Sequence, residues 1–139
     1  MCSSDLVGRE AYYLEPADPR YTGELLHGPI DPGGFLCYRP WQTAYKVIAN
    51  CETIMGSDEA DAGATGVAQT LTAYSLMRLV YLWDINGARL NYDGDIAASV
   101  STKAEVLAEI ESLLDGGYSD LGTAGSAFSF SLSGGFEGF

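Results

Sequence analysis

The longest helical pattern in the chain runs from Gly66 to Trp83, where apolar residues recur at steps of mostly three and four. The stripe consists of Val67, Leu71, Tyr74, Met77, Val80 and Tyr81. Further apolar residues widen it, so that about half of the helix circumference or more is apolar. The pattern predicts a helix from about Asp61 to Trp83 that neighbours cover on several sides. On that prediction, replacing Leu71 or Met77 by Ala costs roughly 2–5 kcal/mol of stability.

An earlier stretch predicts an amphipathic helix from Pro40 to Met55. Proline is favoured in the first turn of a helix, so we expect the helix to start at that residue and to end at Gly56. Its inward stripe consists of Trp41, Tyr45, Ile48, Glu52 and Met55. Glu52 is the one polar residue of the stripe. Because a short polar link separates this helix from the central one, we expect the two to pack antiparallel, with Trp41 or Tyr45 touching the central helix.

A third pattern predicts a helix from Thr102 to Asp115. It opens with a capping box, because the Glu105 side chain can reach back to the Thr102 amide. Its apolar stripe consists of Val106, Leu107, Ile110, Leu113 and Leu114. The Gly116–Gly117 pair follows, and we expect it to stop the helix. Turn dipeptides on both sides of Ala88–Tyr92 predict a short strand or extended stretch there.

The composition changes outside residues 40–117, which form the predicted helical core. Prolines and glycines are frequent in residues 1–39 and predict a long irregular arm. Residues 118–139 are rich in glycine and serine with interspersed phenylalanines, which predicts a loop. We expect all three segments to belong to one domain, and the sequence looks cut at Phe139.

Charge and composition exclude several classes of function. With 19 acidic and seven basic residues the net charge is −12, and no basic stripe is present, which disfavours nucleic acid and anionic lipid as partners. Three cysteines and one histidine lack the spacing of a zinc site or a disulfide framework. No phosphate-binding loop or nucleophile motif is present. We therefore predict no metal, no cofactor and no catalytic residue.

Three stretches taken together carry a resemblance to a known family. They are WQTAYKVIANCETIM, then GVAQTLTAYSLMRLVYLW, then STKAEVLAEIESLLDGG leading to FSFSLSGGFEGF. In this order they resemble the N-terminal part of the SusD/RagB family of outer-membrane nutrient-uptake proteins. The stretch DPRYTGELLHGPIDPGGF in the arm is similar to the approach to the first of these helices in one branch of that family.

The resemblance implies a mostly α-helical fold of tetratricopeptide-like helix pairs with long irregular loops. It also implies a lipid-anchored protein of the outer membrane, facing the cell surface, with a SusC-like TonB-dependent transporter as partner. Family members bind oligosaccharides or other nutrients without altering them. The chain departs from the family because it lacks an export signal with a lipidation cysteine, and Cys2 does not match that residue. We expect residues 1–139 to be an incomplete, N-terminal part of a single SusD-like domain.

Sugar binding requires aromatic faces and planar polar groups on accessible loops. The candidates for ligand binding are Tyr12, Tyr38, Arg39 and Tyr92. The alternative for each is that it holds the irregular arm against the helices. Two other functions remain open: a helical-repeat module that binds a protein, and a hydrolase that uses carboxylates.

Overall fold

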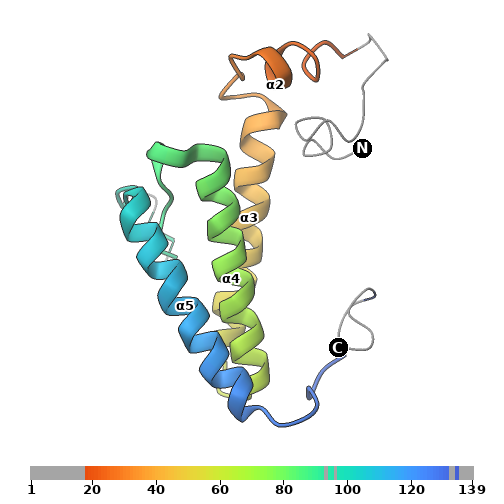
Figure 1. Ribbon diagram of the computed structural model, residues 1–139, viewed down its shortest axis with the longest axis vertical. Coiled ribbons are helices and arrows are strands. Elements are labelled where there is room, and N and C mark those ends of the chain that lie inside the picture. The colour runs from red at the N-terminus through yellow and green to blue at the C-terminus, as the bar shows by residue number, and fades with distance from the viewer. Residues whose placement is uncertain (1–17, 93, 96, 132–133, 135–139) are drawn as a thin grey trace. The chain divides into compact units, whose positions relative to one another are not determined.

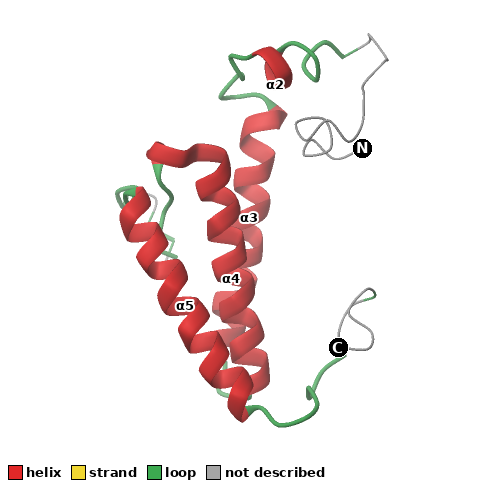
Figure 2. Cartoon of the chain, viewed as in Figure 1, coloured by secondary structure: helices red, strands yellow, loops and turns green. Residues whose placement is uncertain are grey.

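The chain is mostly helical over the residues that the computed structural model describes, which are 18–92, 94–95, 97–131 and 134. The elements, shown in Figures 1 and 2, are α2 (Glu24–His27), α3 (Phe35–Met55), α4 (Ala62–Trp83), the 3-10 helix η1 (Asp84–Asn86) and α5 (Lys103–Thr123). None of the described residues forms a β-strand, and the strand predicted at Ala88–Tyr92 is reduced to one antiparallel bridge between Ala88 and Ser101. The mostly α fold class is therefore confirmed. The described helices are all too short or too polar to span a bilayer.

The chain divides into two compact units, Met1–Thr43 and Ala44–Phe139, so that the boundary falls within α3. The first unit corrects the prediction that a helix starts at Pro40, because α3 begins at Phe35 and Pro40 lies inside it. The Gly34 carbonyl already accepts the amide of Tyr38 at 3.0 Å, so the helix is established before the proline is reached. Pro40 removes one backbone hydrogen bond within the second turn, and α3 continues past it to Met55, where it ends as predicted.

The second unit is built around α4, which runs antiparallel to α5 and to the Ala44–Met55 part of α3 (Figure 1). Two helix starts are confirmed there. The Asp61 side chain accepts the Ala64 amide at 2.7 Å, and the capping box of Thr102 and Glu105 is formed. The core of this unit consists of Ala44, Ile48, Cys51, Ala68, Thr72, Ala73, Leu76, Leu79, Val80, Ala88, Val106 and Ile110.

The side of α4 that faces inward differs from the one predicted. Leu71 is 41% exposed and Tyr81 is 78% exposed, although both belong to the predicted inward stripe. Small side chains such as Thr72 and Ala73 are buried in their place, although Val80 of the predicted stripe is buried as well. The periodicity located the helix but not its orientation, because α4 carries apolar residues on every side and its small residues allow the neighbouring helices to approach most closely.

Close packing also explains why α5 does not stop at Gly116–Gly117 but continues to Thr123. A Cβ atom added at Gly66 of α4 would lie 2.8 Å from the Leu121 side chain and 3.0 Å from the Gly117 carbonyl oxygen. Gly117 is itself buried against α4, next to the Thr70 hydroxyl. The contact between the two helices therefore overrides the low helix propensity of the glycines.

Candidate functional site

An aromatic and cationic cluster in the first unit surrounds the Phe35 ring. The Tyr21 ring meets it edge-on with centroids 5.8 Å apart, and the guanidinium carbons of Arg20 and Arg39 lie 4.5 and 5.4 Å from its centroid. Arg20 also donates two side-chain hydrogen bonds of 2.8 Å to the Asp18 carboxylate, which lowers the pKa of Asp18. These contacts hold the preceding chain against the start of α3, which is the structural role considered for aromatic residues of the arm.

Two of the predicted ligand-binding residues lie beside this cluster. Tyr38 and Arg39 were expected on a loop but belong to the early turns of α3, because that helix starts at Phe35. Tyr38 keeps 46% of its surface exposed, whereas the Arg39 guanidinium rests on the Phe35 ring. Tyr12 lies outside the described residues, and Tyr92 belongs to the second unit.

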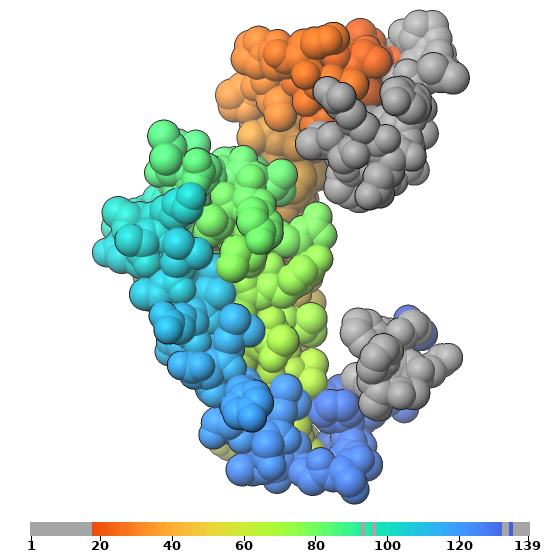
Figure 3. Space-filling model, viewed as in Figure 1, coloured from red at the N-terminus to blue at the C-terminus, as the bar shows by residue number. Residues whose placement is uncertain are grey.

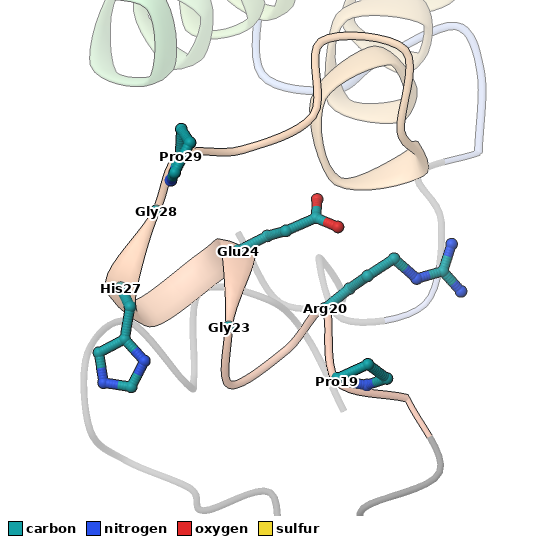
Figure 4. Close-up of a pocket in the computed structure, with 7 residues that line it drawn as sticks. All are labelled: Pro19, Arg20, Gly23, Glu24, His27, Gly28 and Pro29. Carbon is teal, nitrogen blue, oxygen red and sulfur yellow. The ribbon is translucent and has the colours of Figure 1, made fainter.

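A shallow depression of about 360 Å³ lies beside α2 in the first unit. It is lined by Pro19, Arg20, Gly23, Glu24, His27, Gly28 and Pro29. Figure 4 shows the His27 imidazole pointing away from the side chains of Arg20 and Glu24. The Glu24 carboxylate instead accepts the Asp31 amide at 3.2 Å. The depression therefore does not bring an acid and a base together for catalysis.

The second unit contains a cluster of two carboxylates and two tyrosines, Glu52, Glu109, Tyr45 and Tyr92, which we call the Glu–Tyr cluster. The Tyr45 hydroxyl donates to the Arg89 carbonyl at 2.9 Å and accepts the Arg89 amide at 2.5 Å. The Tyr92 hydroxyl is buried and has no hydrogen-bond partner within the described residues. Burial, followed by the Glu109 charge, raises the pKa of the Tyr92 hydroxyl and that of Glu52. The Tyr92 hydroxyl thus stays protonated at neutral pH and can donate a hydrogen bond.

The sequence contained part of the signal for this cluster. Tyr92 was a predicted ligand-binding residue, and Glu52 interrupts the apolar stripe of α3. Glu109 was not predicted, because its place beside Glu52 depends on how α5 packs in the unit. Within the part of the chain that the structure describes, no three His, Cys, Asp or Glu side chains gather closely enough to hold a metal ion.

Replacing Glu52 by Gln is expected to raise the midpoint of thermal unfolding at neutral pH. Burial and the Glu109 charge raise the pKa of Glu52 in the folded state above its ordinary value of about 4.3, so folding disfavours the ionised form. This penalty is absent at low pH, where Glu52 is protonated in both the folded and the unfolded state. It grows as pH rises between the ordinary and the raised pKa, and stays constant above that window.

Calorimetric melts at about pH 7 and pH 3.5 test this, with Glu59→Gln as a control because Glu59 is exposed in the link before α4. We expect the gain from Glu52→Gln at pH 7 to disappear at pH 3.5, and the control to change little at either pH. A lower midpoint for Glu52→Gln at pH 7 would contradict the assignment of Glu52 to a site that disfavours its charge.

The two units carry different kinds of polar and aromatic groups. Exposed aromatic and cationic groups lie in the first unit, and a buried hydroxyl with nearby carboxylates lies in the second. Comparisons of the chain with models of protein families, with curated proteins and with solved structures return no match.

Proposed function

We propose that this chain is part of a non-catalytic binding protein of the SusD/RagB kind. In this proposal it captures an oligosaccharide or another nutrient at the cell surface and passes it to a SusC-like TonB-dependent transporter in the outer membrane, where a lipid anchor holds the complete protein. One observation carries the proposal. The three stretches that resemble the family coincide, in order, with the three long helices α3, α4 and α5.

The chemistry of the two units is compatible with a neutral polyhydroxy ligand. The exposed ring of Tyr38 offers a flat apolar face of the kind that stacks on sugar C–H groups, and Arg39 next to it offers N–H donors. In the second unit, a sugar hydroxyl that reached Tyr92 would satisfy its unpaired hydroxyl group. Neither interaction requires the ligand to carry a charge.

Tyr38→Ala is expected to weaken binding of a neutral glycan by about 1 kcal/mol, because the stacked ring is lost. Titration calorimetry of the protein against a panel of neutral oligosaccharides measures this. Lys46→Ala, an exposed position on the same helix, is the control and is expected to leave the affinity unchanged. Affinity that falls steeply with added salt would contradict a neutral ligand, since salt screens only charged groups.

Analysis of the same mixtures for cleaved product separates binding from hydrolysis. Product that disappears on Glu52→Gln or Glu109→Gln would replace this proposal with a carboxylate-dependent hydrolase.

A helical module that binds a protein is the second candidate, and a specific observation favours it. Large apolar side chains are exposed along α4 and α5. A large exposed apolar surface is typical of protein–protein interaction sites. Failure to bind any glycan, together with protein association through these helices, would favour this candidate.

A further inference from the structure

A continuous apolar surface lies on the second unit where α4 and α5 run side by side. We call it the α4–α5 face. On α4 it consists of Leu71, Tyr74, Tyr81 and Leu82, and on α5 of Leu107, Leu114 and Tyr118. Tyr118 is 84% exposed, the highest value among the α5 members of this set. Most of these residues follow one another at steps of three, four or seven, and the adjacent Tyr81 and Leu82 lie toward the two edges of the surface.

The two sets lie on the same side of the helix pair. Each set is about a quarter of a turn away from the positions where the helices touch, which include Gly66 on α4 and Gly117 on α5. Helix α3 packs against a different side of α4, where Cys51 lies next to the Thr72 hydroxyl. Figure 1 shows α4 and α5 in front with the lower part of α3 behind, and Figure 3 shows the green and blue surfaces of α4 and α5 meeting on that front side.

Two opposite charges lie among these apolar side chains. Arg78 is exposed on α4, and its guanidinium carbon lies 5.9 Å from the centroid of the Tyr74 ring. Glu111 is exposed on α5, and neither residue forms an ion pair within the described part of the chain. Counting along the antiparallel helices from the Gly66 contact places the two residues about one turn apart. Their side chains lean toward the N-termini of their own helices, and therefore toward a common level.

We propose that a second copy of this chain covers the α4–α5 face in a two-fold symmetric dimer. A two-fold axis parallel to the helix pair lays α4 of each copy over α5 of the other. Because the side chains of Arg78 and Glu111 lean toward a common level, this operation brings each Arg78 guanidinium toward Glu111 of the second copy. The same operation sets the tyrosines and leucines of α4 against those of α5, so the surface is complementary to itself.

Area and charge both support a second copy as the occupant. The seven apolar side chains of the face expose on the order of 800 Å² together, which is similar to the roughly 800 Å² that each partner contributes to a stable interface. The face adds one positive and one negative charge, so it needs no basic partner to neutralise it. Repulsion between two chains of net charge −12 is largely screened beyond about 8 Å at physiological ionic strength.

Exchanging the charges at Arg78 and Glu111 tests the proposal by sedimentation equilibrium on the whole chain. The unmodified chain is expected to dimerise reversibly. In Arg78→Glu the symmetric pairs become two Glu–Glu contacts, and in Glu111→Arg they become two Arg–Arg contacts. Each variant alone should dimerise about tenfold more weakly or worse. An equimolar mixture of the two variants restores both opposite-charge pairs, and we expect it to form a heterodimer with affinity close to that of the unmodified chain.

Two control variants change the net charge by the same amounts at positions outside the α4–α5 face. Lys46→Glu on α3 and Glu59→Arg in the link are both exposed, and we expect them to leave dimerisation unchanged. Far-ultraviolet circular dichroism verifies that every variant keeps its helices. An unmodified chain that stays monomeric at about 100 μM, roughly 100-fold above the micromolar affinity of a weak interface, overturns the proposal. Association that the two face variants leave intact, or a mixture that fails to recover it, overturns it as well. None of these results depends on whether the protein binds a glycan.

Discussion

Replacing Gly66 by Leu is expected to lower the free energy of unfolding by about 3 kcal/mol. The first added carbon would lie 3.0 Å from the Gly117 carbonyl oxygen and 3.1 Å from the Leu121 amide nitrogen. Both neighbours are backbone atoms, which cannot turn aside as a flexible side chain can. Helices α4 and α5 must therefore separate, and the buried side chains next to the contact lose part of their packing. Urea denaturation followed by circular dichroism measures the change.

Gly122→Leu is the matched control for this experiment. Gly122 is also helical and lies on α5, yet a Cβ atom placed there meets nothing within 4 Å. Leucine is a better helix former than glycine, so this variant is expected to gain a few tenths of a kcal/mol, up to about 1. Similar losses at both positions would mean that the two helices do not depend on the close approach at Gly66.

Leu76→Ala is expected to cost about 2–5 kcal/mol, whereas Leu71→Ala should cost less than about 1. The two leucines lie five residues apart on α4 and undergo the same change, but Leu76 is 0% exposed and Leu71 faces solvent. Unfolding should be measured at protein concentrations low enough that self-association adds nothing to stability. The opposite order of costs would show that the stripe containing Leu71 is the inward one, as its periodicity predicted.

Local sequence signals located the helices well where they act over a few residues. The capping box at Thr102 depends on side chains within one turn and forms as predicted, and α4 begins next to Asp61, where the sequence placed its start. The start of α3 was missed because Pro40 is compatible with a helix start, although the turn at Gly34 had already begun the helix. A permitted start is thus weaker evidence than a side chain that caps the helix.

Features that depend on packing between distant parts of the chain could not be predicted from local sequence. The continuation of α5 through Gly117 depends on Gly66, which is far away in the sequence. The orientation of α4 depends on which of its apolar sides the neighbours cover. For the same reason the sequence analysis named Tyr92 as a candidate but not Glu109, since only the packed unit brings α5 near that tyrosine.

The α4–α5 pair is joined at two well-separated places. Near one end lies the contact of Gly66 with Gly117, and near the other the Ala88–Ser101 bridge holds the two ends of the connecting segment together. The Lys103 ammonium group also pairs there with the Asp84 carboxylate. At a rise of 1.5 Å per residue, about 25 Å of α4 separates the two places. Two helices that touch at a single crossing can rotate relative to each other about that point. Contacts at two places this far apart oppose such a rotation. We therefore expect α4 and α5 to move as one rigid unit, so that a force applied to one helix is transmitted to the other.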